Sequence, residues 1–93
     1  MNYRVRFTNN NVRRVQVTVV SNRTENFQIQ PGDTDDTTVM PEGTAFTFYW
    51  RDDDNTCRIC NDPLCHPNTL TMPGSDLDIA LPDPAGRWPK QTV

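Results

Sequence analysis

The three cysteines and the single histidine of this chain lie within ten residues, at Cys57, Cys60, Cys65 and His66. Thiolates and imidazole are the side chains that hold soft metal ions, form disulfides and act as nucleophiles. The Cys57-x2-Cys60 spacing lets a tight turn point two sulfurs at one ion, and Cys65 is near enough in sequence to be a third ligand. The segment therefore predicts a structural zinc site of Cys57, Cys60, Cys65 and His66. His66 is its weakest ligand because adjacent side chains diverge.

Two other states of these thiols agree with the same spacing. A disulfide from Cys65 to Cys57 or Cys60 would brace a loop in a small secreted domain and leave one thiol over. Alternatively, all three cysteines stay reduced and have no special role. Nucleophilic catalysis is not expected, because Cys65 and His66 are neighbours that point apart and the sequence offers no second histidine as a base. A sandwich of this size also rarely encloses a catalytic pocket, so we do not expect an enzyme.

Apolar and polar residues alternate along most of the chain, which predicts β-strands. The predicted strands are residues 3–8, 15–19, 27–30, 38–40, 46–50 and 77–81. The first two should form a hairpin, since the asparagines at 9–11 tolerate the left-handed backbone of a tight turn. Phe46, Phe48 and Trp50 share one face and are expected to pack in the core against the last strand.

Eight prolines, many β-branched residues and frequent turn signals leave no long window of helical periodicity. We therefore predict an all-β fold, a small antiparallel β-sandwich or flattened barrel of six to seven short strands. The 93 residues are expected to form one domain at 1–81, with a long cysteine-containing loop at 52–74. Residues 82–93 are predicted to be a proline-rich irregular arm that packs Trp88 on the domain.

The net charge of −3 is distributed unevenly, because residues 1–14 contain four arginines and no acid. Nucleic-acid binding by the whole surface is not expected from an acidic chain. A basic stripe with Arg4 and Arg6 is a candidate contact for an anionic partner. The acidic runs at 33–36 and 52–54 are candidates to neutralise it instead. The sequence as given shows no signal peptide and no transmembrane segment, so we expect a soluble domain that does not act in a membrane.

Tyr49 alternates with the expected core residues and should lie on the outer face of its strand. Tyr49 and Trp88, with Tyr3, are predicted to form a surface that stacks a sugar ring or anchors a protein partner. An exposed edge strand would also allow self-association or addition of a partner strand.

Three functions follow from these features, and the sequence leaves them open. The leading one is a non-enzymatic binding or assembly module whose Cys57–His66 loop is braced by zinc. The second is a secreted, disulfide-braced, lectin-like or effector-type domain that binds carbohydrate or a protein surface. The third is a small metal- or redox-active thiol protein.

Overall fold

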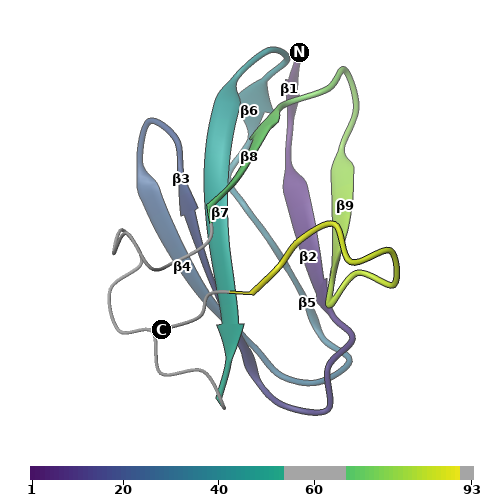
Figure 1. Ribbon diagram of the computed structural model, residues 1–93. Helices are drawn as coiled ribbons and strands as arrows, with labels where there is room; N and C mark the ends of the chain where they lie inside the picture. Colours follow the sequence, from purple (N-terminus) through teal and green to yellow (C-terminus); the bar gives the residue numbers. More distant parts are fainter. Residues whose placement is uncertain (54–66, 91–93) are drawn as a thin grey trace.

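The structure is a computed structural model that describes residues 1–53 and 67–90, and all of the regular elements in these two ranges are β-strands (Figure 1). The strands are β1 (Asn2–Tyr3), β2 (Val5–Asn9), β3 (Val15–Val20), β4 (Thr24–Ile29), β5 (Thr34–Asp36), β6 (Met40–Pro41), β7 (Ala45–Asp52), β8 (Asn68–Thr71) and β9 (Leu77–Leu81). The predicted all-β class is therefore confirmed. The described part of the chain contains no helix long and apolar enough to cross a membrane.

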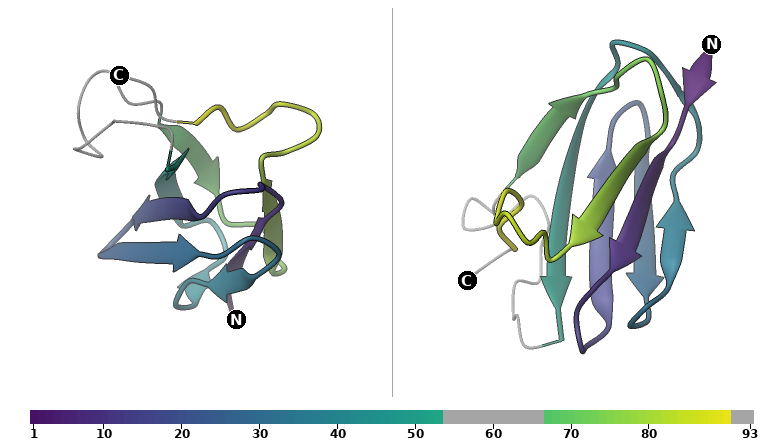
Figure 2. Two further views of the ribbon diagram at one scale, coloured as in Figure 1. Left: turned by 90° about the horizontal axis from the view of Figure 1, so that it is seen from below. Right: turned by 90° about the vertical axis from the view of Figure 1, so that its right-hand side faces the viewer.

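Two sheets face each other and make the sandwich, as the views in Figure 2 show. The larger has the strand order β4-β3-β7-β8, and the smaller has the order β5-β2-β9. β1 and β6 form a separate two-stranded ribbon. Among the described strands, all pairs are antiparallel except β2 and β9, which run parallel from Val5 opposite Leu77 to Asn9 opposite Leu81. The expectation of a wholly antiparallel fold is thus wrong at this one pair.

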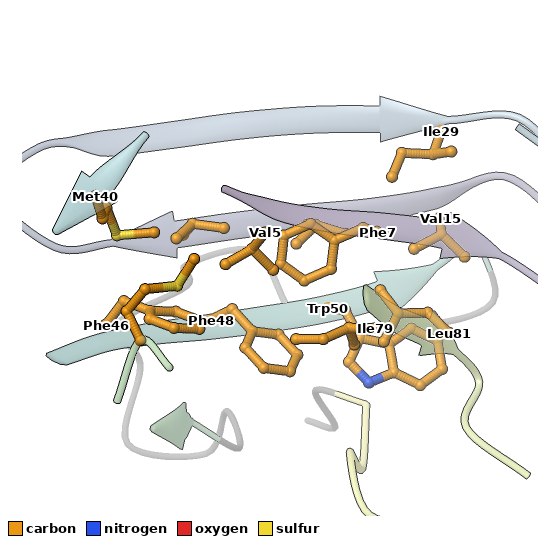
Figure 3. Close-up of a cluster of buried hydrophobic side chains, with 13 residues drawn as sticks. Val5, Phe7, Val15, Ile29, Met40, Phe46, Phe48, Trp50, Ile79 and Leu81 are labelled. Atoms are coloured by element: carbon orange, nitrogen blue, oxygen red, sulfur yellow. The ribbon is translucent and has the colours of Figure 1, made fainter. Parts of the chain in front are cut away.

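The core lies between the sheets and contains the inward residues of β2, β3, β7 and β9 (Figure 3). Phe46, Phe48 and Trp50 on β7 are between 0% and 4% exposed, as their alternation predicted. Phe7 from the smaller sheet meets Phe48 edge to face, with ring centroids 5.4 Å apart. This contact joins the two sheets at the centre of the molecule, and β7 and β9 share the core as expected.

The predicted hairpin of the first two long strands is wrong. β2 pairs with β5 and β9, whereas β3 pairs with β4 and β7, so the connection between β2 and β3 passes from one sheet to the other. Asn9 organises this crossing while only 1% exposed. Its Nδ2 donates to the carbonyls of Arg13 and Ile29 at 2.9 and 2.8 Å, and its Oδ1 accepts from the backbone N–H of Asn11 at 2.7 Å. The hydrogen bonds of the buried Asn9 side chain, rather than a tight hairpin turn, therefore shape the connection between β2 and β3.

The other departures concern short strands. β8 lies inside the predicted loop 52–74, which shortens the connection between β7 and β8 to residues 53–67. β5 was not predicted, and the strand expected at 38–40 is reduced to β6, with Val39 45% exposed. β5 and β8 contain mostly polar residues, so they lack the alternation that identifies a strand. They form because β2 and β7 offer free edges to pair with.

Candidate functional site

A pocket of about 320 Å³ opens between the β2–β3 connection, the end of β7 and the C-terminal arm. Its lining comes mostly from the arm and consists of Asn11, Trp50, Asp52, Pro82, Asp83, Gly86, Trp88, Pro89 and Lys90. Two indole rings, two carboxylates, one amide and one amine thus converge on a single concave site.

The arm is held on the sandwich by its tryptophan, as the sequence predicted. The ring of Trp88 meets Phe48 edge to face at a centroid distance of 5.6 Å, and Trp88 packs against the core while staying half-buried. The indole Nε1 of Trp50 donates to the backbone carbonyl of Trp88 at 2.6 Å. The guanidinium of Arg87 lies 5.3 Å from the centroid of the Trp88 ring, within the range of a cation–π contact. One side of the pocket is therefore an aromatic wall with fixed orientation.

Asp52 lines the same pocket and is 5% exposed. Its Oδ2 accepts a hydrogen bond from Asn11 Nδ2 at 2.9 Å and an ion-pair bond from Lys90 Nζ at 3.1 Å. Because an unpartnered carboxylate is costly to bury, these contacts help to stabilise Asp52 in its buried position. In the sequence, Asp52 belongs to the acidic run 52–54. It also lies two and four positions after Trp50 and Phe48, so it shares their face of β7. That spacing was the available signal that its side chain points inward.

A second carboxylate braces the turn of the arm. Arg87 Nε donates to Asp83 Oδ2 at 2.6 Å, and the side chain of Asp83 is only 7% exposed. This hydrogen bond from Arg87 lowers the pKa of Asp83 and raises that of Arg87. Gly86 completes the turn with φ of +68°, a conformation that favours glycine. Each carboxylate in the pocket is thus matched by a cation, which leaves a polar site of little net charge.

The predicted zinc ligands, Cys57, Cys60, Cys65 and His66, lie outside the described residues. Within residues 1–53 and 67–90, no group of three or more His, Cys, Asp or Glu side chains is placed to hold a metal ion. The chain enters the cysteine-containing connection directly after Asp52, which lines the pocket, and returns at Asn68, the partner of Phe48 in the sheet. The zinc site stays a prediction.

Arg4 and Arg6 are placed beside acidic side chains, as the second interpretation of the basic stripe expected. Arg6 Nε donates to Asp36 Oδ1 at 2.8 Å, and Arg4 Nη1 lies 3.9 Å from Asp36 Oδ2. The hydrogen bond from Arg6 holds the pKa of Asp36 below its ordinary value. Arg14 similarly pairs with Asp53 at 3.1 Å. Three of the four arginines in residues 1–14, namely Arg4, Arg6 and Arg14, therefore lie beside carboxylates of the two acidic runs.

The predicted joint surface of Tyr49, Trp88 and Tyr3 does not form. Tyr49 points outward from β7 and lies opposite Thr18 in the register, whereas Trp88 packs on Phe48, an inward neighbour of Tyr49. Tyr3 packs at the margin of the core. Tyr49 and Trp88 are consequently on opposite faces of the larger sheet.

Comparison of the chain with protein-family models, with curated proteins and with solved structures finds no match.

Proposed function

We propose that this chain is a non-enzymatic binding module that holds a compact, hydroxyl-rich ligand, about the size of one sugar ring, in the pocket beside the C-terminal arm. The observation that carries the proposal is the combination of the buried carboxylate of Asp52 with the aromatic wall of Trp88 in one concave site. Ligand pockets commonly span about 300–1,000 Å³, and this one lies at the lower end of that range.

The chemistry of the lining favours an uncharged polar ligand. Asp52 and Asp83 are each paired with a cation, so a strongly charged ligand finds no opposite charge to neutralise. An indole face packs against the apolar C–H face of a sugar ring, while the amide of Asn11 and the amine of Lys90 can bond to its hydroxyls.

The same lining supports binding rather than catalysis. Among the described residues that line the pocket there is no histidine, cysteine or serine to act as a nucleophile or base. Both carboxylates have structural partners: the contact of Asp52 with Lys90 joins the arm to the sandwich, and that of Asp83 with Arg87 braces the turn within the arm.

Replacing Asn11 with alanine is expected to weaken the binding of a monosaccharide by about five- to tenfold. The change removes one hydrogen-bonding side chain from the pocket, and a typical hydrogen bond contributes about 1 kcal/mol. The measurement is the perturbation of backbone amide NMR signals during titration with glucose, mannose, galactose and N-acetylglucosamine. Asn10→Ala, in the same connection but exposed, is the matched control and should bind like the parent chain. Perturbations remote from the pocket, or equal binding by Asn11→Ala, would contradict the proposal.

We further propose that zinc braces the Cys57–His66 segment of this module. Support comes from the Cys57-x2-Cys60 spacing and from Cys65 and His66 close behind it in the sequence.

Native mass spectrometry is expected to show about one zinc per chain, and a chelator should remove it and lower the midpoint of thermal unfolding. Cys57→Ser should lose the metal. A mass two units lower without metal would favour the disulfide-braced, secreted alternative instead. Reversible thiol oxidation at physiological potential would favour the redox-active alternative.

A further inference from the structure

One outer strand of the sandwich offers a long row of unpaired backbone groups. β4 is an end strand of the larger sheet and lies at its left-hand margin in Figure 1. With six residues it is the longest of the four end strands of the facing sheets, since β5, β8 and β9 have three, four and five. It contains neither proline nor lysine, which commonly protect such edges. An edge of this kind can accept a further strand.

The pairing with β3 identifies the backbone groups of β4 that point outward. The N–H of Ser21 donates to the carbonyl of Arg23 at 3.0 Å, which marks these two as a hydrogen-bonded pair of the β3–β4 ladder. Such pairs alternate in an antiparallel ladder, so every second residue from Glu25 onward bonds to β3. The residues between them direct their N–H and C=O groups away from β3: Thr24, Asn26 and Gln28. In the described part of the chain, these six groups have no hydrogen-bond partner.

The inward side of this edge is acidic. The carboxylate oxygens of Glu25 accept from the N–H and the hydroxyl of Thr38 at 3.0 and 3.2 Å. Asp35 on β5 lies opposite the buried Phe7, so it shares the inward face of its sheet, yet it is exposed. β4 and β5 lie at the same margin of the sandwich, as the right-hand view of Figure 2 shows. Among the described residues, no Lys or Arg forms an ion pair with Glu25 or Asp35.

These carboxylates select the charge of the strand that can be added. A second copy of the chain would bring its own Glu25 and Asp35 to this margin, and like charges that point inward oppose such pairing. A strand with Lys or Arg at alternate positions would place its cations beside them instead. Phe27 follows Glu25 on the same side of β4 and is half-buried, so the aliphatic stems of Lys and Arg can cover its ring.

We propose that β4 binds an extended basic peptide, about as long as its own six residues, as an additional antiparallel strand. The unpaired N–H and C=O groups of β4 supply the hydrogen bonds. Every second side chain of the peptide is Lys or Arg and points inward, toward Glu25 and Asp35. This edge is separate from the pocket, which is lined by the β2–β3 connection, the end of β7 and the arm.

Titration with a synthetic heptapeptide of alternating lysine and valine, with lysine at both ends, tests this proposal. Backbone amide NMR signals of Thr24, Asn26 and Gln28 should shift most, in physiological salt that screens unspecific attraction. With the lysines pointing inward, the N–H groups of the valines face β4, because residues directly opposite share a face. N-methylation of the valines should therefore weaken binding about tenfold or more, whereas N-methylation of three lysines should change it by less than about threefold. The analogue with glutamate in place of lysine should not bind.

The charge preference is tested by a double variant. Glu25→Gln with Asp35→Asn should weaken binding of the lysine–valine peptide about fivefold, as expected for the loss of two exposed ion pairs. Glu42→Gln with Asp78→Asn is the matched control, since it changes the net charge equally at exposed residues outside β4 and β5, and it should bind like the parent chain. Asn11→Ala should also bind like the parent chain, which distinguishes this edge from the pocket.

The methylated peptides are applied to the parent chain, so their result does not depend on the folding of any variant. Amide signals of β4 that do not shift, equal binding of the valine-methylated and unmodified peptides, or equal binding by the Glu25/Asp35 double variant and the parent chain would overturn the proposal.

Discussion

Replacing Phe48 with alanine is expected to lower the free energy of unfolding by about 3–5 kcal/mol. Phe48 is fully buried, and its ring contacts Phe7 from the opposite sheet and Trp88 from the arm. The substitution leaves a cavity where the two sheets and the arm meet. Domains are typically stable by only about 5–15 kcal/mol, so this loss is a large fraction of the total stability.

Urea unfolding followed by tryptophan fluorescence measures this effect. Phe48→Leu should cost distinctly less because it fills most of the cavity. Val20→Ala is the matched control from the outer face of the larger sheet, where 39% of the residue is exposed, and it should change stability by about 0.5 kcal/mol or less. A loss below about 1 kcal/mol for Phe48→Ala would mean that the sheets and arm do not depend on this contact.

Replacing Asn9 with alanine is expected to cost about 2–4 kcal/mol. The buried amide makes three hydrogen bonds, to the carbonyls of Arg13 and Ile29 and from the N–H of Asn11, and alanine leaves all three backbone groups without this partner. Each unsatisfied buried group costs about 1–3 kcal/mol, reduced where water can enter. The change should also displace Asn11, whose side chain binds Asp52 in the pocket.

Two measurements separate these effects. Chemical unfolding gives the loss of stability, and amide NMR signals of the 10–14 connection report whether the crossing has rearranged. Asn10→Ala is the matched control, since Asn10 is exposed. Asn9→Ala with unchanged stability and unchanged signals at Asn11 would show that the backbone alone directs the chain between the sheets.

Alternation was enough to predict the strands that carry the core. Val15, Val17 and Val19, like Phe46 and Phe48, identify their own inward face, because side chains alternate across a strand whatever it pairs with. Pairing could not be predicted in the same way. The path from β2 to β3 depends on a hydrogen bond from Asn9 to Ile29, which is twenty residues away in sequence. Local turn chemistry contains no information about such a contact.

Part of the candidate site could also be predicted from the sequence. Trp88 was expected to pack on the domain because a tryptophan in a polar arm has few other ways to bury its ring. The partnership of Asp52 with Lys90 was not predictable, since these residues lie 38 positions apart and meet only after the arm crosses the end of the sandwich.

The parallel pairing of β2 with β9 also determines when the fold can be completed. β2 is the central strand of the smaller sheet, and its partner on one side is the last strand, about seventy residues further along the chain. During synthesis, the hydrogen bonds on that edge of β2 cannot form until Leu81 has left the ribosome. The larger sheet, apart from β8, assembles from strands between Val15 and Asp52 and can pair much earlier. Because contacts between distant segments close slowly, docking of β9 is expected to be the late, rate-limiting step of folding.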